Sequence, residues 1–348
     1  MTTNQHIIGL DIGGANLKAA SVDGQAASRA FAIWREPERL GEQLNSLLAS
    51  LPTADALAVT MTAELADCFQ TKEDGVRRIL ESVLHAASGR PVVVWQTGGE
   101  FVTVADAMEL SQFVAAANWH ALATFSGRLA EKGDALLIDI GTTTTDIIPI
   151  QDGIPIPWGR TDRQRLASHE LVYTGVGRTP VCSLANQVTL DDHPIGLAAE
   201  LFATTRDVYL LTGDQQEDAG CCDTADGRPA TRANASSRLA RMLCCDTTEI
   251  GDDQLLEVAQ QIASIQLERL VRAVTRVIGI SQDDPYPVET ILISGSGSFL
   301  ARRLVAAHRD LAASRQIDLG DCFSGDVATA ACAFAVARLA QERVIDFL

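Results

Sequence analysis

The octapeptide DIGGANLK, at residues 11–18, follows an apolar run at residues 7–10. A second octapeptide, DIGTTTTD at residues 139–146, follows an apolar run at residues 135–138. In both, an acid ends a strand and a glycine opens a turn of small residues before a second strand. Glycine permits a tight turn, and successive backbone N–H groups in such a turn form an anion-binding surface. Two such hairpins predict two facing halves that bind a phosphate chain and Mg²⁺ between them.

The bulk composition is that of an ordinary globular protein. The chain has 348 residues, a length natural for two domains, with 47% hydrophobic and 21% charged residues. Its formal net charge is −17, and such a surface repels nucleic acid and anionic membranes. The first residues lack the basic segment of a signal peptide, and no apolar run is long enough to cross a bilayer. We therefore expect a cytoplasmic protein whose eight cysteines are thiols without a metal-binding C-x-x-C spacing.

Hydrophobic periodicity predicts an α/β chain in two halves. The predicted strands are Ile7 to Asp11, Leu17 to Val22, Ala30 to Trp34, Ala56 to Met61, Pro91 to Trp95, Ala135 to Ile140, Ile147 to Ile150 and Thr290 to Ser294. The predicted helices are Glu38 to Leu51, Lys72 to Ala87, Ser111 to Ala130, Ala233 to Leu243, Asp253 to Ile278, Phe299 to His308 and Ala328 to Leu339. We place the first half at residues 1–132 and the second at residues 133–348, with an insertion at about residues 153–248.

A third glycine loop follows the strand ILIS at residues 291–294. Together with the two hairpins, it resembles the actin, Hsp70 and sugar-kinase superfamily. That resemblance implies an actin-like ATPase fold, which is a duplicated ribonuclease H-like fold with a central cleft. It also implies that the hairpins bind phosphate and that the late loop touches an adenosine. The phosphate-binding residues it implies are Gly13, Gly14, Asn16, Lys18, Gly141, Thr142, Thr143, Thr144, Gly295, Ser296 and Gly297.

A closer resemblance covers stretches in both halves. These stretches are VTMTAELADCF at 59–69, AANWH at 116–120, DIGTTTTDIIPI at 139–150, ELVYTGVGRTP at 170–180 and DTADGRP at 223–229. They resemble a hydantoinase- or oxoprolinase-like family linked to tetrahydromethanopterin-dependent one-carbon metabolism. The resemblance implies a transferase of methanofuran biosynthesis. It would join the phenol of a γ-glutamyltyramine- or tyrosine-like acceptor to an aminomethylfuran-methyl diphosphate, with release of diphosphate.

Two other functions suit the same motifs. The glycine loops would equally suit an ATP-dependent small-molecule kinase or ATP hydrolase. A non-catalytic nucleotide-binding switch, as among actin relatives, is the third alternative. The partners expected for a transferase are a small-molecule diphosphate and a phenolic acceptor, with a homodimer as a candidate assembly and with neither nucleic acid nor membrane.

Three acids are the candidate metal ligands: Asp11, Asp139 and Asp146. Mg²⁺ prefers hard oxygen ligands, and the paired loops would supply them. Asp11 and Asp139 could instead cap the ends of their strands, and Asp146 could be a supporting acid or a turn residue. Lys18 is a candidate catalytic and phosphate-binding charge, or else an exposed surface lysine.

A phenol has an unperturbed pKa of about 10, so an acceptor phenol needs a base or a nearby positive field. Glu64 and Asp67 follow the strand that ends at Met61. In sugar-kinase-like proteins, the corresponding region carries the acid that activates the acceptor. We therefore nominate Glu64 first and Asp67 second as general base. The alternative for Glu64 is an acid that stabilises the start of the next helix.

Two further residues are candidates for substrate binding. His120 could line the cleft, or be a packed histidine. Arg178 could bind the glutamyl carboxylates with two hydrogen bonds, or form a surface ion pair. The turn at residues 223–228 is either a substrate lid or a plain surface turn. The adjacent residues Asp191, Asp192 and His193 lack the spacing of a metal site.

Overall fold

The structure is a computed structural model that describes residues 5–280, 288–323 and 325–343. It contains two large sheets. The first has the strand order β3-β2-β1-β4-β5-β6, and the second has the order β10-β8-β7-β13-β14, with β9 on β8. The strands of the first sheet are β1 (Ile7–Ile12), β2 (Asn16–Ser21), β3 (Ala26–Ala30), β4 (Ala56–Met61), β5 (Val92–Trp95) and β6 (Phe101–Thr103). Those of the second are β7 (Asp134–Ile140), β8 (Thr145–Gln151), β9 (Ile154–Pro155), β10 (Leu171–Val172), β13 (Thr290–Ser294) and β14 (Arg315–Asp318).

The two sheets repeat one topology. In each, an antiparallel hairpin (β1–β2 or β7–β8) pairs on one side with an antiparallel third strand, β3 or β10. On the other side the hairpin pairs in parallel with β4 or β13, which in turn pairs in parallel with β5 or β14. This duplication confirms the predicted actin-like, ribonuclease H-like fold. The predicted boundary at residues 132 and 133 stays a prediction.

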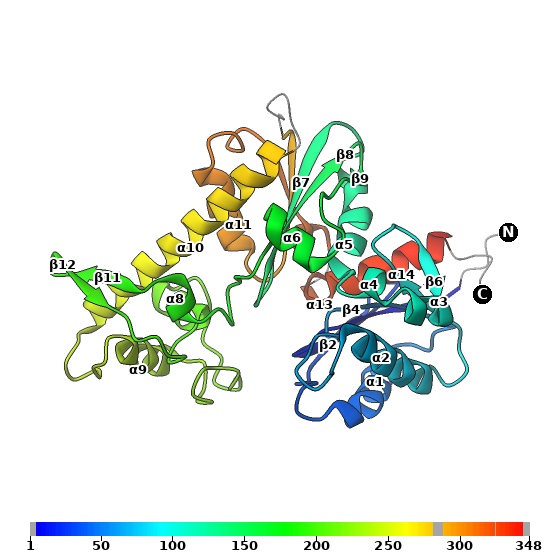
Figure 1. Cartoon of the computed structure of the whole chain (residues 1–348), viewed down its shortest axis with the longest axis horizontal. Helices are drawn as coiled ribbons and strands as arrows, with labels where there is room; N and C mark the ends of the chain where they lie inside the picture. The colour runs from blue at the N-terminus through cyan, green and yellow to red at the C-terminus, as the bar shows by residue number, and fades with distance from the viewer. Residues whose placement is uncertain (1–4, 281–287, 324, 344–348) are drawn as a thin grey trace.

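Helices cover both faces of each sheet (Figure 1). On the first sheet, α1 (Leu40–Leu48) and α2 (Lys72–Ala87) share one core with β1 and β4. On the second, α10 (Asp252–Ile280) and α11 (Ser298–Ala307) share another with β7 and β13. A third core joins the two sheets through α5 (Asn118–Ser126) and α14 (Ala331–Arg343). The last helix therefore packs between the halves rather than on the second alone.

The remaining elements are short connections or belong to a lobe at one side. The connections are η1 (Pro37–Arg39), α3 (Val104–Glu109), α4 (Ser111–Val114), η2 (Gly127–Leu129), α6 (Asp162–Ser168), α12 (Leu319–Cys322) and α13 (Gly325–Thr329). The lobe contains α7 (Val181–Leu184), β11 (Gln187–Leu190), β12 (His193–Gly196), α8 (Thr205–Thr212) and α9 (Arg232–Met242). Figure 1 shows α10, in yellow, running from the second half into this lobe, which has its own apolar core. Of the expected insertion, β9 and β10 pair with β8 and so belong to the second sheet.

Two predicted elements are wrong. The third strand ends at Ala30, because the N–H groups of Phe31 and Ile33 donate to carbonyls of the first hairpin. The single helix predicted from Ser111 to Ala130 is broken between α4 and α5, where Ala116 has a φ of 48°. A positive φ at a residue other than glycine interrupts a right-handed helix. No disulfide joins the eight cysteines, all of which lie among the described residues.

We predict that Gly9→Ala destabilises the protein. A Cβ at Gly9 would overlap the carbonyl oxygen of Ala333 and lie 2.9 Å from the Ala337 nitrogen, so α14 would have to move off β1. Overpacking of this kind costs about 1–3 kcal/mol of unfolding free energy. Urea unfolding followed by circular dichroism measures it. Gly196→Ala is the control, because a Cβ there meets nothing within 4 Å. Equal midpoints for both variants would contradict the close packing of α14.

Candidate active site

The tip of the first hairpin is held by the chain segment that follows β3. The Gly13 N–H donates to Asn16 O at 3.0 Å, which closes the turn between β1 and β2. The carbonyls of Gly14 and Ala15 accept hydrogen bonds from the Ile33 and Phe31 N–H groups at 3.0 and 2.9 Å. The tip carbonyls therefore point toward this segment.

The tip of the second hairpin is held in the same way by residues 176–178. The Gly141 N–H donates to Thr144 O at 2.9 Å. The Gly141 carbonyl accepts from the Val176 N–H at 3.0 Å, and the Thr142 carbonyl accepts from two N–H groups, those of Gly177 and Arg178. The two hairpins thus share their turn, and in each a following segment holds two tip carbonyls, one position earlier in the second turn than in the first.

This attachment decides where the tip N–H groups point. In a trans peptide, the N–H of one residue points opposite to the carbonyl of the residue before it. No peptide bond is cis among the described residues. The N–H groups of Ala15 and Asn16, and those of Thr142 and Thr143, therefore point away from the segments that hold the carbonyls. Successive N–H groups that point the same way are the kind of arrangement that can bind an anion.

The carboxylates beside the two tips lie close enough to affect one another. Asp11 is opposite Lys18 in the β1–β2 register, and Asp139 is opposite Asp146 in the β7–β8 register. Burial, and next the Asp146 carboxylate, raise the pKa of Asp139 to about 7, and Lys18 of the other hairpin opposes this rise. Burial also raises the pKa of Asp11, again against Lys18. The structure thus brings all four predicted charges into one cluster.

Two of these acids suit a cation. Asp11 is 7% exposed, and its Oδ1 is buried without a hydrogen-bond partner. A buried, unpartnered carboxylate oxygen is costly unless a positive charge compensates it. Asp146 instead forms an ion pair with Arg165. Within the described residues, no three His, Cys, Asp or Glu side chains form a metal-binding group. Mg²⁺ is commonly held by one or two carboxylates plus substrate phosphates, so Asp11 and Asp139 fit such an ion.

The late glycine loop packs directly on the second hairpin. Gly295 has a φ of 89°, and a Cβ there would overlap Ile140 O and lie 2.5 Å from Asp139 Oδ1. The Gly297 N–H donates to Ile140 O at 2.8 Å, whereas Ser296 is exposed. The structure therefore places the predicted loop Gly295–Gly297 beside Asp139.

A buried polar network supports the second tip. Gln266 of α10 donates to Thr174 Oγ1 at 2.8 Å and to Gly175 O at 2.9 Å, and it accepts from the Tyr209 hydroxyl at 2.6 Å. A Cβ at Gly175 would overlap the tip backbone from Gly141 to Thr143. Only glycine can therefore occupy position 175, and this role of Gly175 was not predicted.

Glu64 and Asp67 lie in different environments. Glu64 is 1% exposed, with Oε2 unpartnered, and its backbone packs on Gly75 of α2. Burial raises the pKa of Glu64 to about 7; backbone N–H groups and Lys72 oppose the rise, and Asp162 of the second half adds to it. Asp67 is exposed. Only Glu64 has the environment of a base that works near neutral pH.

His120 is buried among aromatic rings. Its ring lies 5.2 Å from that of Trp119 and 5.8 Å from that of Trp95. Burial, followed by the charges of Arg160, Arg165 and Arg343, lowers the pKa of His120 to about 4. His120 is therefore a neutral packed histidine near pH 7, one of the two alternatives left open by the sequence.

Arg178 reaches across to the first half. Its guanidinium carbon lies 5.3 Å from the centroid of the Trp34 ring. Arg178 belongs to the segment that holds the second tip, and Trp34 directly follows the segment that holds the first. This cation–π contact therefore connects the segment that holds the first hairpin tip with the segment that holds the second.

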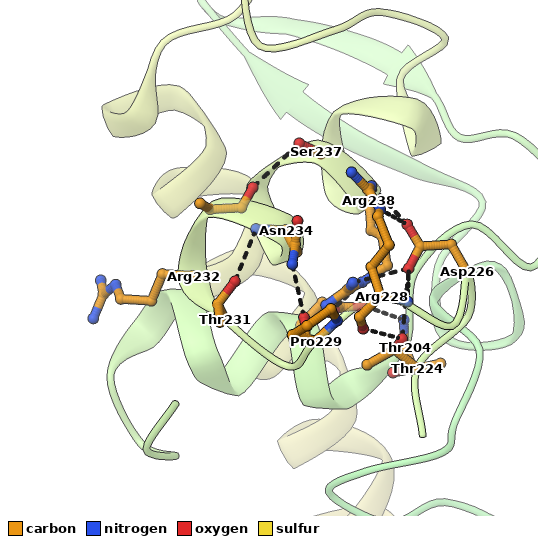
Figure 2. Close-up of polar contacts among 12 residues, drawn as sticks. Thr204, Thr224, Asp226, Arg228, Pro229, Thr231, Arg232, Asn234, Ser237 and Arg238 are labelled. Atoms are coloured by element: carbon orange, nitrogen blue, oxygen red, sulfur yellow. Dashed lines mark hydrogen bonds and ion pairs between the residues drawn. The ribbon is translucent and has the colours of Figure 1, made fainter. Parts of the chain in front are cut away.

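The turn at residues 223–228 is anchored to the lobe (Figure 2). Asp226 accepts hydrogen bonds from Arg228 and, at 3.0 Å, from Arg238 Nη1. Arg238 is fully buried and also pairs with the fully buried Asp207 at 2.7 Å. Burying an unpaired charge is costly, so Arg238 must keep its acidic partners. Its ion pair with Asp226 therefore holds the turn against the lobe. Asp191, Asp192 and His193 are exposed on the β11–β12 hairpin.

Arg165 is a second residue of the site whose role was not predicted. It is 1% exposed and lies between Asp146 and Trp119. Residues 160–165 contain three arginines, and no local pattern distinguishes the buried Arg165 from the exposed Arg163. The capping signal T-x-x-Q at Thr161 and Gln164 was the available clue, because it predicts the helix that carries Arg165 inward.

Comparison with known proteins agrees with this architecture. Residues 55–343 match the hydantoinase/oxoprolinase family. The chain belongs to the hydantoinase/oxoprolinase family. A family relative from Methanocaldococcus jannaschii is 34% identical over 341 residues, which cover 97% of this chain and 98% of the relative. Another, from Methanococcus vannielii, is 30% identical over 211 residues, which cover 61% of this chain and 92% of the relative. Both are named (4-{4-[2-(γ-L-glutamylamino)ethyl]phenoxymethyl}furan-2-yl)methanamine synthase.

A solved structure also shares the fold of this family member. Nucleotide-free acetone carboxylase aligns with a TM-score of 0.52 at 11% identity, over 85% of this chain and 66% of that chain. Among the helices in the described part of the chain, none is long and apolar enough to span a membrane.

We predict that Glu64→Gln stabilises the protein at pH 8. Because the folded-state pKa of about 7 exceeds the ordinary 4.5, stability is lost as pH rises between these values. The neutral amide removes this cost, worth about 1–3 kcal/mol in unfolding free energy. Urea unfolding at pH 8 and at pH 4.5 measures it, and little difference is expected at the lower pH.

The control for this measurement is Asp67→Asn, which changes an exposed carboxylate three residues away. It should alter stability by less than about 0.5 kcal/mol at both pH values. A Glu64→Gln variant with wild-type stability at pH 8 would mean that the Glu64 carboxylate is solvated.

Proposed function

We propose that this protein is a transferase of methanofuran-type cofactor biosynthesis. It forms an ether between the phenol of a γ-glutamyltyramine- or tyrosine-like acceptor and an aminomethylfuran-methyl diphosphate, and it releases diphosphate. The observation that carries the proposal is the 34% identity, over 97% of the chain, to a synthase named for a product that contains a phenoxymethyl-furan ether. The geometry of the hairpins supports it independently, because a leaving diphosphate needs N–H donors and positive charge.

The reaction exchanges one carbon–oxygen bond for another. The phenol oxygen attacks the furfuryl carbon, and the bond between that carbon and the diphosphate oxygen breaks. Glu64 accepts the phenol proton, since a carboxylate with a pKa of about 7 is half ionised near neutral pH. The diphosphate leaves with the electron pair of the broken bond.

The two hairpins stabilise the departing charge. The N–H groups of Ala15 and Thr142 donate to the diphosphate oxygens, and Lys18 adds a point charge. Asp11 and Asp139 would hold Mg²⁺, which when bound neutralises part of the negative charge on the diphosphate. These donors explain how a chain with a net charge of −17 binds an anion.

The test is to incubate the purified protein with Mg²⁺, the furan diphosphate and γ-glutamyltyramine or tyrosine. We expect one ether and one diphosphate per turnover, measured by mass spectrometry and a pyrophosphate assay, without ATP. Asp11→Asn, Asp139→Asn and Glu64→Gln should each lower kcat about 100-fold, the size of loss when one stabilising group is removed.

Each variant should melt at or above the wild-type temperature, because each removes a charge that burial disfavours. ATP turnover that requires an acceptor would replace the proposal with a kinase. Nucleotide-dependent assembly without turnover would replace it with a switch.

A further inference from the structure

The helix α6 carries charged side chains toward the meeting point of the two halves. Its start is fixed by a capping box, in which the Thr161 hydroxyl accepts from the Gln164 N–H and the Gln164 side chain accepts from the Thr161 N–H. Asp162 and Arg165 follow, one helical turn apart. Arg165 is 1% exposed, a burial that arginine tolerates only when its charge is paired.

The Arg165 guanidinium makes four contacts at once. Its Nη2 forms an ion pair with Asp146 and donates to Glu170 O at 3.2 Å, and its Nη1 lies 3.6 Å from Asp162 Oδ1. Its central carbon lies 3.9 Å from the centroid of the Trp119 ring on α5. A planar guanidinium can pair in its plane and stack on its face at the same time, whereas an ammonium cannot.

The partners of Arg165 belong to the two parts of the site that take part in the proposed reaction, the second hairpin and the surroundings of Glu64. Asp146 stands opposite Asp139 in the hairpin that we assign to the diphosphate. The Ala116 backbone, three residues before Trp119, hydrogen-bonds the Glu64 carboxylate, and the charge of Asp162 adds to the rise in the pKa of Glu64. Arg165 therefore connects the second hairpin, through Asp146, with α5, through Trp119, at the end of α5 that follows the Ala116 contact of Glu64.

We propose that Arg165 is a positioning residue that holds Asp146, Asp162 and Trp119 together. It thereby fixes the distance between the diphosphate-binding hairpin and Glu64. With that distance fixed, the phenol reaches the furfuryl carbon before water does. The inference rests on the proposed function and adds to it a residue that controls which nucleophile reacts.

Two outcomes compete at the furfuryl carbon, and both are balanced reactions. Attack by the phenol gives the ether and diphosphate, and the phenol proton passes to Glu64. Attack by water gives the furfuryl alcohol and diphosphate, and the proton passes to solvent. Diphosphate is released in both, so the ratio of diphosphate to ether reports the share lost to water.

The experiment measures diphosphate, ether and alcohol in the same reaction with the full-length chain. Wild-type protein should give a ratio of diphosphate to ether of about one. In Arg165→Met, we expect ether formation to fall at least about 10-fold, since a misplacement near 1 Å costs up to about 100-fold. The ratio should rise at least about three-fold by the same reasoning, with a matching amount of alcohol. The KM for the furan diphosphate should change much less, because the tip N–H groups remain.

The matched control is Arg163→Met, which removes an exposed arginine from the same helix. It should keep the wild-type ratio and rate. Arg165→Lys keeps the charge but loses the stacked plane, so its ratio should lie between those of the wild type and Arg165→Met. It also serves as the test variant if Arg165→Met does not fold.

A folded Arg165 variant with the wild-type ratio would overturn the inference, even if its rate or stability fell, because a purely structural role lowers ether and diphosphate together. Failure of the proposed function looks different. In that case, the wild-type protein itself forms no ether from the furan diphosphate and either acceptor.

Discussion

The hydrogen bonds that hold the hairpin carbonyls are the constraint on which the site depends. Gly14 and Ala15 in one half, and Gly141 and Thr142 in the other, give their carbonyls to N–H groups of a following segment. Because a trans peptide is planar, fixing each carbonyl also fixes the next N–H in the opposite direction. An anion bound at the tips, as we propose, would therefore need no basic side chain at the centre of its site, which suits a strongly acidic chain.

The burial of the acids in this site has an electrostatic consequence. Packing the two hairpins together buries carboxylates near one another, and burial favours their protonated forms. Burial and the Asp146 carboxylate raise the pKa of Asp139 to about 7, and burial outside the hairpins raises that of Glu64 to about 7. In the proposed function, one of these acids lies beside the leaving group and the other beside the acceptor, and the charge of both changes near neutral pH. In our account, the first assists diphosphate departure through a cation and the second removes the phenol proton.

Local patterns predicted much of the fold, and tertiary contacts account for what they missed. The helix Lys72–Ala87 and the strand Thr290–Ser294 have the predicted bounds, since their apolar periodicity is strong and continuous. The third strand was misplaced because the N–H groups of Phe31 and Ile33 bind the distant hairpin tip, a pairing that no local pattern reveals. The clustering of Asp11, Lys18 and Asp139 was predicted from the repeated motif. The burial of Arg165 was not, because it depends on Trp119, which is far away in the sequence.

The most direct measurement is a crystal structure of the protein with Mg²⁺ and pyrophosphate. The account predicts pyrophosphate between the two tips, with its oxygens about 2.7–3.2 Å from the N–H groups of Ala15 and Thr142. It also predicts Mg²⁺ between the pyrophosphate and the carboxylates of Asp11 and Asp139. Pyrophosphate bound elsewhere, or tips whose carbonyls have turned toward the anion, would contradict it.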